Sequence, residues 1–418
     1  MTLGPVETLA LAGLLVLGGY GLRRIVPVLG RLNIPAPVLG GLAGAALLAL
    51  LPRVGVAVPT LDADARTPLM VAFFATVGFG ASLRLLRRGG PQVALLLGLA
   101  TVGAVVQNIV GAGIAVSMGE APLLGVLAGS VTLTGGPATG LAFAPLFEKA
   151  GVAGATEIAL AAAMAGIVIG GLVGAPLSTW LVGRHGLRPS SPGTAAGAAP
   201  NAPPHDAHTV MQANLPEPPQ PHLPIGEDES AYALVRHVVL LLVLVWAGGA
   251  LSAWVAGASS GSGIAFPGYI GALVLAVAVR AVEDRTRWLG LSQRLIDDLG
   301  GVCLALFIAL ALLTLDLSAL AAAALPLAVI VAAQTLLVVA MALVPFRLLG
   351  RDYDAAVMAG GFVGFMMGTT ANALANMGAV AERYGPAPRA FLVVPLVGGL
   401  FIDVTNALLI SACLSIFG

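Results

Sequence analysis

Two stretches rich in glycine, serine and threonine interrupt apolar sequence in this chain. The first is 129–140, which contains Gly135-Gly136-Pro137, and the second is 364–376. Glycines let the backbone turn and approach a ligand closely. Backbone N–H groups freed by such breaks, and the N-termini of half-helices, attract anionic groups. Hydroxyls and freed carbonyls are the hard oxygen ligands that suit Na⁺. The two stretches are therefore candidates for binding an anion and a small cation.

The competing interpretation is helix packing, because small residues are common where helices meet in lipid. For any single glycine or serine we favour packing, whereas for the two stretches as units we favour ligand binding. The candidate contacts to an anionic ligand are Ser130, Thr134, Gly135, Gly136, Thr139, Gly368, Thr369, Thr370 and Asn372.

One carboxylate, Asp403, lies within an apolar run. A carboxylate inside a membrane span is costly and usually functional. Beside Thr405 and Asn406 it is a candidate Na⁺ ligand or proton carrier. The alternatives are an interfacial residue or a structural partner to an arginine. The candidate cation ligands are Asp403, Thr405, Asn406, Asn376 and Thr132.

Other polar residues in apolar runs favour structural roles. Glu157 opens its helix, where the helix dipole favours a carboxylate, and Asp316 ends a span and is expected at the interface. Gln107 and Gln334 lie mid-helix, where interhelical hydrogen bonds explain them as well as ligand contact does. Arg389 is the nearest candidate partner for a ligand carboxylate, but an interfacial anchor is the favoured interpretation.

The sequence lacks the common motifs of catalysis. It contains no HExxH, no paired cysteine/histidine set and no phosphate loop, and His237 is the one histidine outside the segment 185–231. An intramembrane metalloprotease is disfavoured, and a serine protease would lack its histidine partner. We therefore predict that the protein is not an enzyme.

The composition predicts the elements that must position these residues. Of 418 residues, 58% are hydrophobic and 10% are charged, whereas a soluble domain carries about 25% charged residues. This excludes an ordinary soluble enzyme and a disordered chain. The 20 basic and 20 acidic residues cancel, which leaves no basic surplus for nucleic acid. The apolar runs do not alternate with polar residues as an outer-membrane barrel requires. An all-α polytopic membrane protein is expected.

A spanning helix needs about 20 mostly apolar residues. Ten runs qualify as candidate spans, some of them short. They are 5–22, 36–52, 67–83, 91–118, 155–183, 233–256, 264–281, 299–315, 319–346 and 388–416. Two further apolar stretches, about 121–147 and 355–381, are broken at their centres by glycines. Irregular backbone at membrane depth must line a cavity or be buried in protein. We therefore expect re-entrant hairpins there, with full spans as the alternative.

The segment 185–231 is rich in proline and polar residues and cannot build a core, so it is expected to be a flexible linker. With ten spans, 17 of the 20 basic residues fall on one side of the bilayer. Basic residues mark the cytoplasmic side. We therefore expect a cytoplasmic linker and both termini outside.

The parts of the chain before and after the linker resemble each other. Pro35 and Pro267 are separated by 232 residues, as are Gly136 and Gly368. Gln107 and Gln334 correspond at a looser offset of 227. The repeat units are 1–184 and 232–418. Each holds five expected spans, an odd number, so the second must insert upside down. Inverted repeats with broken elements near the midplane are typical of secondary transporters.

At this point the sequence resembles the bacterial sodium/glutamate symporters over nearly the whole chain except the linker. The most specific pieces are Asn33-Ile34-Pro35-Ala36-Pro37-Val38-Leu39-Gly40-Gly41 and Leu127-Ala128-Gly129-Ser130-Val131-Thr132-Leu133-Thr134-Gly135-Gly136. Others are 68–78, Ala155-Thr156-Glu157, 352–357, Ala375-Asn376-Met377, 391–395 and Phe401-Ile402-Asp403.

The resemblance implies ten spans in two inverted halves, each with a glycine-rich re-entrant loop. It implies Na⁺-coupled uptake of L-glutamate across the bacterial inner membrane, with Na⁺ as the coupling ion and no organic cofactor. The design is also similar to that of the sodium/citrate carriers. By that similarity we expect a homodimer in which a transport domain moves past a fixed scaffold.

Two residues depart from the family pattern of the loops. Ala138 stands where the first loop usually has a glycine, and Met366 replaces the middle glycine of the second. Side chains at these positions predict a smaller or reshaped pocket. The alternatives are therefore another organic anion or amino acid as substrate, or a cation/proton exchanger. A non-transporter, such as a receptor, is the least favoured.

Overall fold

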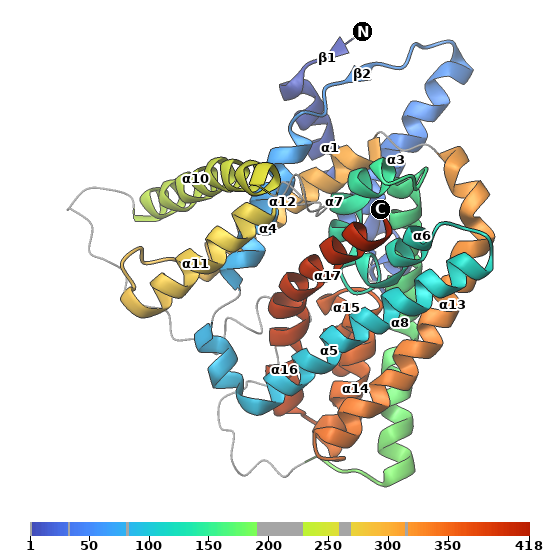
Figure 1. Ribbon diagram of the computed structural model, residues 1–418, viewed down its shortest axis with the longest axis vertical. Helices are drawn as coiled ribbons and strands as arrows, with labels where there is room; N and C mark the ends of the chain where they lie inside the picture. Colours follow the sequence, from blue (N-terminus) through green and yellow to red (C-terminus); the bar gives the residue numbers. More distant parts are fainter. Residues whose placement is uncertain (1, 32–33, 81–82, 190–228, 259–268, 314–316) are drawn as a thin grey trace. The chain divides into compact units, whose positions relative to one another are not determined.

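The computed structural model describes residues 2–418 except 32–33, 81–82, 190–228, 259–268 and 314–316 (Figure 1). Most of the expected linker, Asp316 and Pro267 lie outside the described residues. The chain divides into two compact units. Each unit combines a segment from the first part of the chain with one from the second.

Unit 1 comprises Met1–Leu83 and Pro216–Leu317. Its helices are α1 (Pro5–Ile25), α2 (Pro27–Arg31), α3 (Ala36–Leu50), the 3-10 turn η1 (Leu51–Val54), α4 (Arg66–Gly80), α10 (Glu229–Ala258), α11 (Ile270–Thr286) and α12 (Gln293–Leu313). Strand β1 (Thr2–Leu3) pairs in parallel with β2 (Thr60–Leu61). Small residues bring the helices of this unit close together. A Cβ added at Gly19 of α1 would lie 2.9 Å from the backbone N of Gly40 in α3.

Unit 2 comprises Arg84–Leu215 and Ser318–Gly418 and contains every candidate ligand residue. Its helices are α5 (Leu83–Ser117), α6 (Pro122–Val126), the π-helical turn η2 (Leu127–Val131), α7 (Gly136–Lys149), α8 (Ala155–His185), α13 (Leu317–Leu348), α14 (Tyr353–Met366), α15 (Thr370–Tyr384), α16 (Pro388–Leu396), the π-helical turn η3 (Val397–Phe401) and α17 (Ile402–Phe417).

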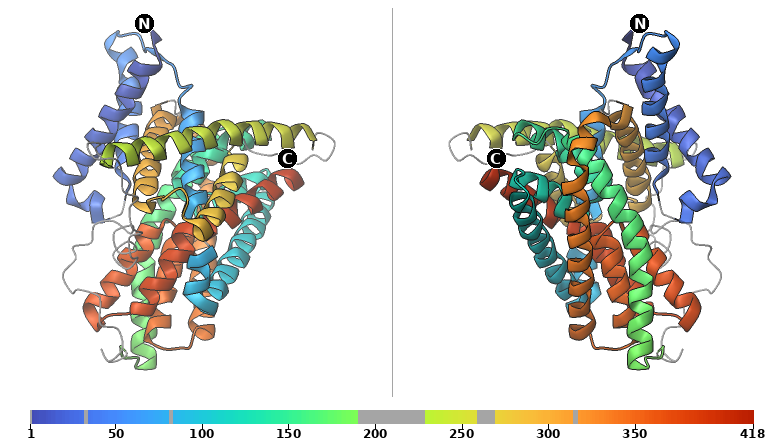
Figure 2. Two further views of the ribbon diagram at one scale, coloured as in Figure 1. Left: turned by 90° about the vertical axis from the view of Figure 1, so that its left-hand side faces the viewer. Right: turned by 90° about the vertical axis from the view of Figure 1, so that its right-hand side faces the viewer.

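Glycine and serine set the packing at the centre of unit 2. Helix α14 lies beside both α8 and α15 (Figures 1 and 2). A Cβ at Gly360 of α14 would lie 2.6 Å from the carbonyl oxygen of Gly174 in α8. One turn later in α8 and one turn earlier in α14, Ser178 Oγ donates to the carbonyl oxygen of Ala356 (2.7 Å). These small side chains let two helix backbones approach closely where apolar burial provides little drive for association.

Seven helical segments among the described residues are long and apolar enough to cross a membrane. They are Pro5–Ile25, Gly90–Ser117, Ala155–His185, Ala231–Val255, Gln293–Leu313, Ala323–Leu348 and Pro388–Phe417. The chain is therefore all-helical with several candidate spans, as a polytopic membrane protein requires. The other three expected spans coincide with the shorter helices α3, α4 and α11. Of these, α3 and α4 have 15 residues each, which corresponds to a length of about 22 Å.

Gly111 in α5 supplies a test of this close packing. A Cβ there would lie 2.9 Å from the carbonyl carbon of Gly125 in α6, whereas a Cβ at Gly113 of the same helix meets nothing within 4 Å. We predict that Gly111→Val lowers the thermal melting midpoint of the purified protein, because overpacking costs about 1–3 kcal/mol. The matched control Gly113→Val should leave the midpoint nearly unchanged. Equal shifts for the two variants would contradict the described α5–α6 contact.

Candidate functional site

Both glycine-rich stretches form a helix, a break and a second helix within unit 2. In the first, η2 has non-helical backbone at Gly129 (φ −99°, ψ −128°) and the chain turns before α7 begins at Gly136. Gly136 has a φ of 70°, a left-handed conformation that glycine adopts without strain. In the second, α14 ends at Met366 and α15 begins at Thr370. The N-cap residue Thr369 accepts a hydrogen bond from the backbone N of Asn372 (3.4 Å).

The two breaks meet each other. Thr134 Oγ1 lies 3.5 Å from the carbonyl oxygen of Met366. A Cβ at Gly136 would lie 3.2 Å from the carbonyl oxygen of Gly368. In both contacts the partners are separated by 232 residues, which is the offset at which the sequence predicts a repeat. Backbone from two distant parts of the chain therefore converges on one place.

The buried side chain of Gln107 in α5 joins the two breaks. Its Oε1 accepts a hydrogen bond from Thr134 Oγ1 (2.6 Å), and its Nε2 donates to the carbonyl oxygen of Met366 (3.1 Å). The carbonyl oxygen of Gln107 in turn accepts from Gln334 Nε2 (2.6 Å). The mid-helix amides thus make interhelical hydrogen bonds. Gln107 was not among our candidate ligand residues. The clue in the sequence was its position as a polar amide in the middle of a charge-free helix.

Three amide and hydroxyl residues surround the start of the first break. Asn108 Oδ1 accepts from the backbone N of Ser130 (3.0 Å), and Asn406 Nδ2 donates to the carbonyl oxygen of Ser130 (2.9 Å). Asn108 and Asn406 therefore bind the backbone that the π-helical turn releases. Ser130 Oγ and Asn406 Oδ1 are buried, and neither has a hydrogen-bond partner among the residues that the structure describes.

Two asparagines fix the second hairpin to helix α8. Asn372 Nδ2 donates to the carbonyl oxygen of Ile167 (2.6 Å), and Asn376 Nδ2 donates to that of Gly170 (2.9 Å). Asn372 Oδ1 is buried and finds no partner within the described part of the chain. The carbonyl groups of α8 carry no signal in the sequence, so they could not be predicted as partners.

The remaining candidates take different partners. Thr132 Oγ1 donates to the carbonyl oxygen of Leu127 (2.8 Å) within its own hairpin, and Thr139 is buried in the first turn of α7. Thr370 Oγ1 donates to the carbonyl oxygen of Gly398 in η3 (2.7 Å). The π-helical turn in the last span therefore contacts the start of α15.

Asp403 and Thr405 lie in the first turn of α17, directly after η3. Thr405 Oγ1 donates to the carbonyl oxygen of Ile402 (3.1 Å) and lies 3.3 Å from Thr101 Oγ1 of α5. Asp403 is partly exposed, and no hydrogen bond or ion pair joins it to any described residue. Among the five candidate cation ligands, Asn406 bonds the backbone of Ser130 in the first break, whereas Asn376 bonds the backbone of α8. Within the described part of the chain, no side-chain hydrogen bond joins any two of the five.

The two departures from the family pattern lie at buried positions. Met366 is fully buried, and its Cε would be 2.8 Å from a Cβ at Gly103, so the glycine in α5 makes room for it. Its Sδ lies 3.7 Å from Thr134 Oγ1. Ala138 is also buried, two residues after Gly136. The methionine therefore packs against α5 and contacts the tip of the first hairpin through its sulfur.

Arg389 has a structural partner. Its Nη2 lies 2.5 Å from Asp352 Oδ1, and its backbone N donates to Asp354 Oδ1 (3.0 Å). Asp352 also caps α14 by accepting from the backbone N of Ala355 (2.9 Å). These bonds fasten the start of α14 to the start of α16.

Known proteins resemble this chain over almost its whole length. The family model described as sodium/glutamate symporter matches residues 1–386. The sodium/glutamate symporter of Escherichia coli (strain K12) is 38% identical over 412 residues, which cover 98% of this chain and 97% of that protein. The protein of the same name from Haemophilus influenzae is 34% identical over 419 residues, covering 99% of this chain and 98% of its own. The chain therefore belongs to the sodium/glutamate symporter family, which consists of transporters and not of enzymes.

Proposed function

We propose that this protein is a Na⁺-coupled symporter that imports L-glutamate across the bacterial inner membrane. The observation that carries the proposal is the meeting of the two helix breaks in unit 2. Unsatisfied backbone at membrane depth is tolerated where it is buried in protein or lines a cavity. Broken helices that meet in this way are typical of transporter binding sites. The names of the curated relatives agree with glutamate and Na⁺ as the transported pair.

The proposed architecture has ten spans in two inverted halves, 1–184 and 232–418, with a re-entrant hairpin in each. Residues near an internal two-fold axis contact their own repeat equivalents. The pairs Thr134/Met366 and Gly136/Gly368 do so at an offset of 232, and this supports the proposed repeat. The distribution of arginines supports a cytoplasmic linker at 185–231 and both termini outside.

The proposed glutamate site lies at the two hairpin tips. Helices α7 and α15 both begin at the breaks, so the positive ends of their dipoles favour a carboxylate there. The proposed contacts are Ser130, Thr134, Gly135, Gly136, Thr139, Gly368, Thr369, Thr370 and Asn372. Because most of their side chains are buried, we propose that backbone N–H groups make much of the contact.

The proposed Na⁺ ligands are oxygen atoms near the same breaks. Asn406 Oδ1 is buried without a partner among the described residues. Leaving such an atom unpaired costs about 1–3 kcal/mol, and a bound cation would remove that cost. Asp403 supplies a carboxylate beside this region. We propose Asp403, Thr405, Asn406, Asn376 and Thr132 as the set from which the ligands come.

Both hairpins belong to unit 2, so the proposed site can move as one body. We assign unit 2 the role of the transport domain and unit 1 that of the scaffold in a homodimer. The similarity to the sodium/citrate carriers supports this elevator-type scheme. The alternative function is transport of another organic anion or amino acid, or cation/proton exchange on the same scaffold, and the side chains of Ala138 and Met366 motivate it.

The coupling ion is tested in liposomes that contain the purified full-length protein. We predict that labelled L-glutamate accumulates with an inward Na⁺ gradient and does not accumulate when K⁺ replaces Na⁺. Unlabelled glutamate should compete, whereas glutamine and citrate, which differ in charge or shape, should compete weakly. Uptake that is unaffected by removal of Na⁺ would contradict the coupling, and displacement by another solute in preference to glutamate would reassign the substrate.

The role of Asp403 is tested by Asp403→Asn, which keeps the size of the side chain and removes its charge. We predict that the Na⁺ concentration for half-maximal uptake rises about tenfold, because bonds to charged groups contribute roughly 1.5–3 kcal/mol. Ser415→Ala is the matched control on the same helix, since Ser415 Oγ donates to its own helix at Ser411 (2.7 Å). If Na⁺ activation is the same in both variants, the cation site lies elsewhere.

A further inference from the structure

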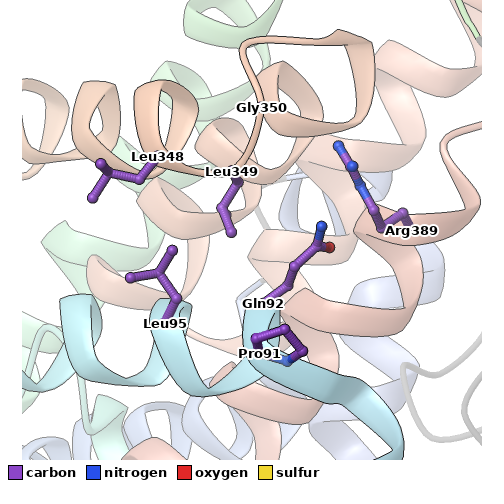
Figure 3. A pocket seen from close by; sticks show the side chains of 7 residues that line it. All are labelled: Pro91, Gln92, Leu95, Leu348, Leu349, Gly350 and Arg389. Carbon is purple, nitrogen blue, oxygen red and sulfur yellow. The ribbon is translucent and has the colours of Figure 1, made fainter.

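A second polar feature of unit 2 lies away from the hairpin tips. A cavity of about 450 Å³ opens between the part of α5 that follows its kink at Gly90, the end of α13 and the start of α16 (Figure 3). Leu95 and Leu348 supply apolar walls, Leu349 and Gly350 close one side, and Gln92 and Arg389 supply the polar groups. The proposed function uses none of these residues as a ligand.

The cavity lies at one end of three candidate spans. Gly90–Ser117 begins there, Ala323–Leu348 ends there, and Pro388–Phe417 begins there. Leu95 is 37% exposed and Leu348 is 57% exposed, so their side chains extend apolar surface out of the cavity. An opening at the end of apolar spans, with apolar surface leading away from it, has the geometry of the membrane–water boundary.

Two hydrogen-bond donors in the cavity lack full partners. Arg389 is held in place by Asp352 and Asp354, yet its Nε is buried and has no partner in the described part of the chain. The amide of Gln92 makes no hydrogen bond to a described residue. Figure 3 shows the guanidinium of Arg389 and the amide of Gln92 extending toward the same space.

Among the described side chains beside the cavity, basic residues outnumber acidic ones by one. Arg347 and Arg351 are exposed on either side of Gly350, and with Arg389 they outnumber Asp352 and Asp354. A bound group should therefore be anionic at its polar end. It should also have an apolar part, because a small soluble anion would leave Leu95 and Leu348 uncovered.

We infer that this cavity binds the headgroup of an anionic phospholipid, with a phosphate oxygen accepting from Arg389 and Gln92 and an acyl chain on Leu95 and Leu348. Basic pockets between spanning helices are known to select such headgroups. The inference is independent of the transported solute, because none of these residues belongs to the proposed glutamate or Na⁺ sites.

Native mass spectrometry of the full-length protein in detergent tests the inference with phosphatidylglycerol as the probe. We expect phosphatidylglycerol to remain bound more strongly than phosphatidylcholine. Gln92→Leu and Arg389→Gln should each weaken retention of the lipid by about fivefold. This is the effect expected from losing one basic or hydrogen-bonding contact near the headgroup. Arg383→Gln is the control, because Arg383 is an exposed arginine in the last turn of α15 and does not line the cavity.

Three outcomes would overturn the inference. Equal retention of the two lipids would show that the headgroup charge is not recognised. Unchanged retention in both cavity variants would place the lipid elsewhere. Displacement of phosphatidylglycerol by millimolar inorganic phosphate would indicate a site for a small free anion. Gln92→Leu decides the matter if Arg389→Gln fails to fold, because Gln92 takes no part in the bonds to Asp352 and Asp354.

Discussion

The cost of unpaired backbone in an apolar surrounding is the constraint on which unit 2 depends. A break in a membrane helix frees N–H and C=O groups, and each needs a partner within the protein. Here the partners are side-chain amides. Gln107 binds both breaks at once, Asn108 and Asn406 bind the backbone of Ser130, and the asparagines of α15 bind α8. These bonds hold the two irregular segments together, and neither segment would be stable alone.

The same bonds determine which polar atoms remain unpaired and can bind a ligand. Each asparagine side chain offers a donor and an acceptor, and in Asn372 and Asn406 the donor is used while the acceptor oxygen stays buried and unpaired. The breaks also expose the starts of α7 and α15, whose dipoles favour negative charge. Acceptors for a cation and donors for an anion therefore lie around one pair of breaks. In the proposed function, coupling follows because one ligand supplies the charge that the other needs.

The sequence predicted the features that depend on local residue type. Glycines located both breaks, and the two glycines spaced by 232 residues, Gly136 and Gly368, lie close together. It could not predict features that depend on distant partners. Met366 is accommodated because α5 has a glycine at position 103. Gln107 could not be distinguished from an ordinary interhelical amide until both breaks were seen to contact it. The two compact units likewise could not be predicted, because each combines a segment from the first part of the chain with one from the second.

The most direct test of the central claim measures how far glutamate protects a cysteine at the second break from modification by a thiol reagent. Ala371 and Ala379 are both exposed on α15, the first beside Thr370 and Asn372 and the second two turns further on. The chain's two cysteines, Cys303 and Cys413, are first replaced by serine. Ala371→Cys and Ala379→Cys are then each treated with a thiol reagent. If the tips bind glutamate together with Na⁺, glutamate in Na⁺ should slow modification at 371 severalfold, have no effect in K⁺, and leave 379 unchanged. Equal rates at 371 with and without glutamate in Na⁺ would contradict the account.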